Sequence, residues 1–218
     1  MLKPYGCLLL FCLHFAPAPA LAQDSLGPKT PKIEVRQDGS GTAITIIDAD
    51  GWQATIDAVL KLRKDSTLSI DDLSALADTK PAAYRYELAR RLCITDPQRG
   101  LRESMRANVE SRYDAKRCVD STAAAGITLT SEILFDFRDT ACNSKDVMGP
   151  DNLFDAMHDL STDPAIVKQR KSPWWICSHG MAAIQAGMEN KTLAKDEWLV
   201  PEDQWLEIWD YLNGKPKQ

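Results

Sequence analysis

The chain has 218 residues, with 31 acidic and 26 basic side chains and a formal net charge of −5 at pH 7. This acidic balance argues against general binding to nucleic acid, because phosphate backbones are bound by an excess of clustered positive charge. The length suits one domain and allows a sizeable hydrophobic core.

Residues 1–22 show the pattern of a secretory signal peptide. Lys3 supplies a positive start, residues 7–15 form a short apolar run, and Ala20-Leu21-Ala22 satisfies the small-x-small rule for cleavage. The apolar run is shorter than the roughly 20 residues that cross a bilayer, so we expect cleavage before Gln23 rather than an uncleaved anchor.

A lipid on Cys7 or Cys12 is an alternative, although the bulky Phe11 is an unfavourable neighbour of the second cysteine. No later segment of the sequence is apolar enough to cross a bilayer. We therefore expect a soluble mature protein that is periplasmic or secreted.

Removal of 22 residues from 218 leaves 196, with 25 basic against 31 acidic side chains and a balance of −6. Residues 23–31 contain two prolines and a glycine and are expected to form a flexible leader. We expect one mostly helical domain over residues 32–214, followed by a loose tail at 215–218.

Four cysteines follow the predicted cleavage site: Cys93, Cys118, Cys142 and Cys177. An even number in an exported protein indicates two disulfides. A metal site or free thiols are the alternative, but the spacings of 25, 24 and 35 residues are unlike those of zinc-binding cysteines.

Two β-rich runs, residues 33–37 and 43–47, flank Asp38-Gly39-Ser40-Gly41 and predict a small hairpin near the start of the domain. The rest of the chain has helical apolar spacing, so we predict a compact multi-helix fold of the mainly α class. Helix starts are predicted at Asp50, Ser69, Pro81, Asp96-Pro97, Thr128 or Thr130, Pro150, Asp163-Pro164, Pro173 and Pro201.

The longest helix is expected to run from Pro97 to Ala125 and to stop at Gly126. One of its faces is charged, and Asn108 and Arg112 interrupt the opposite, apolar face. If Arg112 is buried, it needs an acidic partner.

This helix length also constrains the disulfides. If residues 101–118 form one unbroken helix, Cys118 lies about 26 Å along it. Bridged α-carbons must lie within about 7 Å, so a Cys93–Cys118 bond is excluded unless the helix breaks. The following helix turns back after Gly126, which led us to predict the pairs Cys118–Cys142 and Cys93–Cys177.

Charge is unevenly distributed along the chain. Residues 80–117 hold ten bases and five acids, whereas residues 120–163 hold nine acids and two bases. We favour pairing between neighbouring helices, because consecutive elements usually pack together. Separate patches for an anionic and a cationic partner are the alternative.

Catalytic motifs are absent from the sequence, and we predict no catalytic residue, metal ligand or cofactor. The two histidines after the signal peptide, His158 and His179, lack the spacing of a metal-binding pair. Ser178 and His179 are adjacent and would point about 100° apart on a helix, so they cannot form a nucleophile–base pair.

Five of the six tryptophans lie in the last 45 residues. Trp205 and Trp209 fit the inward face of the last helix. A continuous helix from Pro173 would place Trp174 inward with Cys177 and Met181, and would leave Trp175 exposed as a possible contact residue.

We carry two functional hypotheses. The first is a binding protein, such as an inhibitor, an immunity protein or an assembly or secretion factor, whose partner is another protein. The second is a hydrolase that uses carboxylates or a metal held by histidines. The sequence leaves enzymatic activity undecided, with the balance towards a binding protein, and leaves the oligomeric state open.

Overall fold

The computed structural model describes residues 32–38, 41–47, 51–64, 68–136, 140–144, 146–149 and 172–212, with the backbone alone for the first two ranges. The predicted signal peptide, the leader, the helices expected from Pro150 and Asp163, and the tail lie outside these residues. Within the described part of the chain, no helix is long and apolar enough to cross a membrane.

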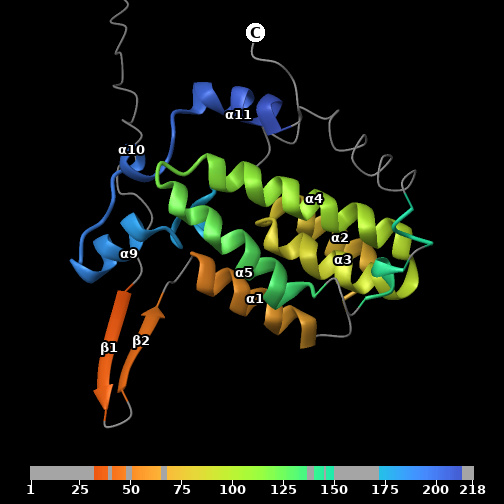
Figure 1. Cartoon of the computed structure of the whole chain (residues 1–218), viewed down its shortest axis with the longest axis horizontal. Coiled ribbons are helices and arrows are strands. Elements are labelled where there is room, and N and C mark those ends of the chain that lie inside the picture. The colour runs from red at the N-terminus through yellow and green to blue at the C-terminus, as the bar shows by residue number, and fades with distance from the viewer. Residues whose placement is uncertain are drawn as a thin grey trace, which may run out of the picture.

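The expectation of a mainly helical fold with two disulfides is confirmed. The longer helices are α1 (Trp52–Lys64), α2 (Ile70–Thr79), α3 (Ala83–Thr95), α4 (Pro97–Lys116) and α5 (Ala125–Leu134). Figure 1 shows α4 and α5 side by side, with α3 behind them and α1 along the lower edge. Most of the large buried side chains lie between these helices.

Shorter elements complete the described chain. They are η1 (Ser121–Ala124), η3 (Ala141–Asn143), α8 (Trp174–Cys177), α9 (Met181–Met188), α10 (Lys195–Trp198), η4 (Glu202–Gln204) and α11 (Trp205–Leu212). Figure 1 shows α11 lying against α4 on the side away from α1.

Two strands, β1 (Lys32–Asp38) and β2 (Gly41–Ile47), contain the predicted β-rich runs. They pair antiparallel, with Lys32 opposite Ile47 and Asp38 opposite Gly41. The two residues between the strands lie outside the described part of the chain.

Two predicted helix starts are confirmed in detail. The Ser69 hydroxyl accepts a hydrogen bond from the backbone N–H of Asp72 at 3.1 Å, which caps α2. The Asp96 carboxylate accepts one from the N–H of Arg99 at 3.1 Å, and proline follows it at the first helical position. These caps satisfy N–H groups that a helix start leaves unpaired.

The predicted length of the longest helix is wrong, because α4 ends at Lys116 and Gly126 lies inside α5. The chain after α4 pairs with a distant segment instead. Val119 donates its N–H to the carbonyl of Trp198 at 3.0 Å, and Val200 donates to the carbonyl of Arg117 at 2.9 Å. This long-range pairing replaces the next helical turn.

The continuous helix expected from Pro173 is also interrupted. Helix α8 ends at Cys177, and Gly180 adopts an extended backbone with ψ near 151° before α9 begins. A Cβ at Gly180 would lie 2.7 Å from a carboxylate oxygen of Asp120, so this close approach requires glycine. Asp120 in turn accepts a hydrogen bond from the N–H of Ala182 at 2.7 Å.

The predicted disulfide pairing is wrong. The bonds are Cys93–Cys142 and Cys118–Cys177, with α-carbon separations of 5.2 and 5.4 Å. Only the exclusion of a Cys93–Cys118 bond agrees with the structure.

The position of η3 explains this pairing. The element η3 lies against the start of α4, next to the end of α3. Cys142 therefore reaches Cys93. Gly100 of α4 permits this approach, because a Cβ there would lie 2.8 Å from both sulfur atoms of that disulfide.

Candidate functional site

Two clusters of ion pairs lie inside the α3–α4 region. The first surrounds Arg85, which is 1% exposed and donates hydrogen bonds to three carboxylates. The partners are Asp78 at 2.7 Å, Glu103 at 2.7 Å and Glu110 at 3.0 Å. Burial by itself lowers the pKa of Arg85, but Glu110 and Glu103 outweigh burial and raise it, so the guanidinium stays charged.

The second cluster surrounds the buried carboxylate of Glu87. It accepts hydrogen bonds from Arg63 at 2.9 Å, Arg90 at 2.8 Å and Arg91 at 3.0 Å. Burial raises the pKa of Glu87, but the bonds from the three arginines outweigh burial and hold the pKa below its usual value. The cluster links α1 to α3 and holds three guanidinium groups in place.

Trp175 is buried, so the expectation that it is exposed is wrong. Its side chain is 2% exposed, and its indole N–H donates to the carboxylate of Asp114 at 2.8 Å. All four residues of α8 are buried, so this helix has no outward face on which Trp175 could lie. The suggested contact role of Trp175 thereby loses the exposure on which it rested.

The C-terminal tryptophans pack largely as expected. Trp209 is 1% exposed and meets Tyr113 edge-on at 5.3 Å between ring centroids. The guanidinium of Arg117 lies between the rings of Tyr113 and Trp205, at 4.6 and 4.5 Å, and pairs with Asp114. These contacts fix α11 to the end of α4.

His179 is half-buried and packs against Trp52, with ring centroids 4.7 Å apart. Desolvation by this burial lowers the pKa of His179. His158 lies outside the described residues, so the two-histidine hypothesis stays untested. Among the residues that the structure describes, no group of three metal-binding side chains comes together.

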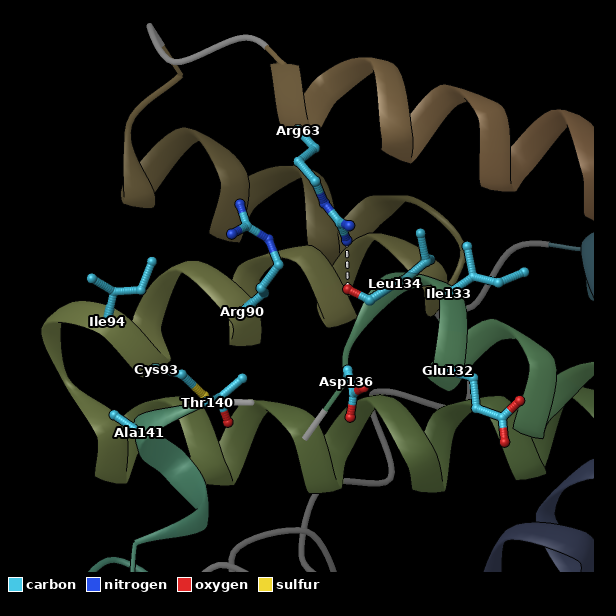
Figure 2. A pocket seen from close by; sticks show the side chains of 10 residues that line it. All are labelled: Arg63, Arg90, Cys93, Ile94, Glu132, Ile133, Leu134, Asp136, Thr140 and Ala141. Carbon is cyan, nitrogen blue, oxygen red and sulfur yellow. Dashed lines mark hydrogen bonds between the residues drawn. The ribbon is translucent and has the colours of Figure 1, made fainter. Parts of the chain in front are cut away.

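A cavity of about 510 Å³ lies where α1, α3 and the end of α5 meet. We call it the arginine pocket, and it is lined by Arg63, Arg90, Cys93, Ile94, Glu132, Ile133, Leu134, Asp136, Thr140 and Ala141. Figure 2 shows Arg63 pointing at the carbonyl oxygen of Leu134, to which it donates a hydrogen bond, with Arg90 beside it. Both arginines belong to the Glu87 cluster, so their positions are set before any ligand arrives.

A second cavity of about 650 Å³ lies between α4, α5 and α11. We call it the basic groove, and it is lined by Asn108, Arg112, Ala115, Lys116, Cys118, Ser121, Ala124, Ile127, Thr128, Ser131, Tyr211 and Leu212. Arg112 is exposed, so the acidic partner required for a buried arginine is not needed.

Helix α5 forms a wall of both cavities. Its first half lines the basic groove, and its last residues line the arginine pocket. Between them, Leu129 is 40% exposed and Ile133 is 41% exposed, and these residues are four apart on one helical face. Ile94 of α3 is 73% exposed and lines the same pocket as Ile133.

We call Leu129, Ile133 and Ile94, with the two cavities beside them, the α5 surface. Sequence reasoning did not identify it. Helical apolar spacing would place Ile133 in the interior with Leu134, and Ile94 carries no signal beyond its place at the end of a helix.

The structure explains part of the uneven charge distribution along the chain. Arginines of residues 80–117 pair with acids of the same segment, as Arg85 does with Glu103 and Arg90 with Glu87. Much of the acidic segment 120–163 lies outside the described residues, so its own pairing stays a prediction.

No protein-family model matches this chain, and no curated protein or solved structure shows significant similarity to it. The α5 surface and the disulfides are therefore the features of this chain that bear on its function.

Proposed function

We propose that the mature chain is an exported, disulfide-stabilised protein that acts by binding another protein through the α5 surface. The compartment would be the periplasm or the extracellular space, where disulfides form and persist. An inhibitor, an immunity protein, or an assembly or secretion factor would each fit this mode of action.

The exposed apolar side chains beside the arginine pocket carry this proposal. Single exposed apolar residues are common on protein surfaces, but apolar residues that surround a cavity indicate an interaction site. Ile94 and Ile133 come from different helices and line the same cavity. An apolar side chain of a partner would bury both against the walls of the pocket.

The fixed arginines support the same function. The side chains of Arg63 and Arg90 are 28% and 29% exposed, and both form ion pairs with the buried carboxylate of Glu87. Arginine is enriched among residues that contribute most to binding, and a preorganised side chain loses less entropy when a partner binds.

A site-specific photocrosslinking experiment tests the proposal. The full chain, carrying a photoreactive residue in place of Ile133, is expressed in the cell that naturally exports it. The control replaces Ala75, which is exposed on α2 and lies outside both cavities. We expect one discrete heavier adduct at position 133, identified by mass spectrometry, and none at position 75.

The substitutions Ile94→Glu and Ile133→Glu together should abolish crosslinking from position 129 while leaving the melting temperature nearly unchanged. Equal adducts at positions 133 and 75, or none at either, would contradict binding through the α5 surface. An adduct of twice the mass of the chain would identify a second copy as the partner and would overturn the proposal of a different protein.

A further inference from the structure

The basic groove contains two cations whose surroundings differ from those of Arg106 and Arg117. Arg106 and Arg117 are each held by a carboxylate of the same helix, at 3.1 and 2.6 Å. Arg112 and Lys116 are exposed, and neither forms an ion pair within the described part of the chain. They lie four residues apart and therefore point to the same side of the helix.

The opposite wall of the groove adds hydrogen-bonding groups without adding negative charge. Ser121 and Thr128 bring hydroxyl groups, each of which can donate one hydrogen bond. Ser131 already donates to the carbonyl of Thr128 at 2.8 Å. None of the described residues that line the groove is acidic.

One acidic residue next to the groove in sequence is directed elsewhere. Asp120 precedes Ser121, but one of its carboxylate oxygens accepts from the N–H of Ala182, and the other accepts from the N–H and hydroxyl of Thr122. These bonds lower the pKa of Asp120 against the opposing effect of its burial and tie it to the start of α9. Asp120 therefore does not neutralise Arg112 or Lys116.

Apolar side chains also contribute to the groove, and they indicate the size of the occupant. Ile127 and Leu212 line it, and so does Tyr211 of α11, which is 65% exposed. A volume of about 650 Å³ accommodates several side chains rather than one small anion. Carboxylates beside apolar residues would match both kinds of surface.

We propose that the basic groove binds an acidic segment of the partner protein, in which Asp or Glu side chains pair with Arg112 and Lys116. This inference rests on the proposed function and specifies the chemistry of the partner. Helix α5 connects the groove to Ile133, so one partner would contact both. The whole chain is acidic, so a local basic groove would also orient an acidic segment during association.

Binding of labelled peptides to the mature protein tests the inference. Fluorescence anisotropy is measured with a peptide of alternating Glu and Leu, a matched peptide of alternating Gln and Leu, and the oligonucleotide dT10. The variant Arg112→Glu/Lys116→Glu reverses the groove charge. Arg102→Glu is the control, because Arg102 is exposed on the same helix and outside the groove.

We expect the Glu–Leu peptide to bind more tightly than the Gln–Leu peptide and to weaken with added salt. The double reversal should weaken it at least about tenfold, while Arg102→Glu changes it less than about twofold. Equal binding of the two peptides, or an equal effect of Arg102→Glu, would overturn the inference. Binding of dT10 at equal strength would assign the groove to anions in general and would also overturn it.

Crosslinking from position 133 distinguishes a failure of this inference from a failure of the proposed function on which it rests. If the adduct persists in the double-reversal variant, and that variant binds the Glu–Leu peptide like the unmodified protein, protein binding stands and the acidic segment is wrong. If position 133 forms no adduct in any variant, the proposed function fails.

Discussion

The interior of the α3–α4 pair and the basic groove use the same kinds of side chain in opposite surroundings. Arg85 is buried and meets three carboxylates, whereas Arg112 is exposed and meets none among the described residues. A buried charge needs such partners to offset its desolvation, but an exposed charge does not. The difference separates arginines that hold the fold from those available to a ligand.

Removal of a disulfide should produce the largest loss in the free energy of unfolding, because the disulfides join the segments that form the interior. The double variant Cys118→Ser/Cys177→Ser opens a link across 59 residues. The chain-entropy treatment gives a loss of about 4 kcal/mol in the free energy of unfolding. Denaturant unfolding measures it, and a loss below about 1 kcal/mol would show that this link contributes little to the fold.

Arg85→Met and Arg112→Met compare the two regions directly. The first removes the buried cation that pairs with Asp78, Glu103 and Glu110, and should reduce the free energy of unfolding by about 3–5 kcal/mol. The second removes an exposed charge and should change it by less than about 0.5 kcal/mol. Equal effects in denaturant titrations would remove the distinction between the two arginines.

Gly100→Ala probes how tightly the first disulfide packs on α4. The added Cβ would lie 2.7 Å from the backbone nitrogen of Cys93, and such overpacking should cost about 1–3 kcal/mol despite the better helix propensity of alanine. Gly149→Ala is the control, since the structure describes no atom beyond the adjacent residues within 4 Å of its added Cβ. A stabilised Gly100→Ala protein would contradict the close approach.

The smallest effect concerns pH and the Glu87 cluster. Because the folded pKa of Glu87 is lowered, the unfolded chain takes up the proton more readily, and the stabilisation is complete only above the ordinary value of 4.5. It should be lost as the pH falls from there through the lower folded pKa. Denaturant titrations of the wild type at several pH values should show this fall in the free energy of unfolding. The variant Glu87→Gln should lack the part of the fall that Glu87 causes. Identical pH slopes would contradict the shift.

Local signals in the sequence predicted several helix starts, although α5 begins at Ala125 and not at Thr128 or Thr130. Ser69, Asp96 and Pro97 act within one helical turn, so their effect can be read from neighbouring residues alone. The apolar spacing also predicted the helical class, because helices of this kind bury one face.

Helix ends and disulfide pairing could not be predicted in the same way. Helix α4 ends where residues 117–119 pair with residues 198–200, and no residue pattern within the helix predicts this contact. The predicted pairing of Cys118 with Cys142 depended on an unbroken helix to Ala125. Long-range backbone pairing overrode the local helical pattern.

The candidate site was the part least accessible from the sequence. Reading residues 173–188 as one amphipathic helix directed attention to Trp175, which is buried, and to Met181 as an inward residue, although it is 61% exposed. The α5 surface combines Ile94 with Ile133, which lie 39 positions apart and meet only through the packing of α3 and α5.

Photocrosslinking from position 133 in the exporting cell, with and without Arg112→Glu/Lys116→Glu, tests the central claim most directly. The account predicts a single protein adduct that is lost on charge reversal and retained with Arg102→Glu. Adducts of equal yield from Ala75 on α2, or no adduct from position 133, would contradict the assignment of the α5 surface to protein binding.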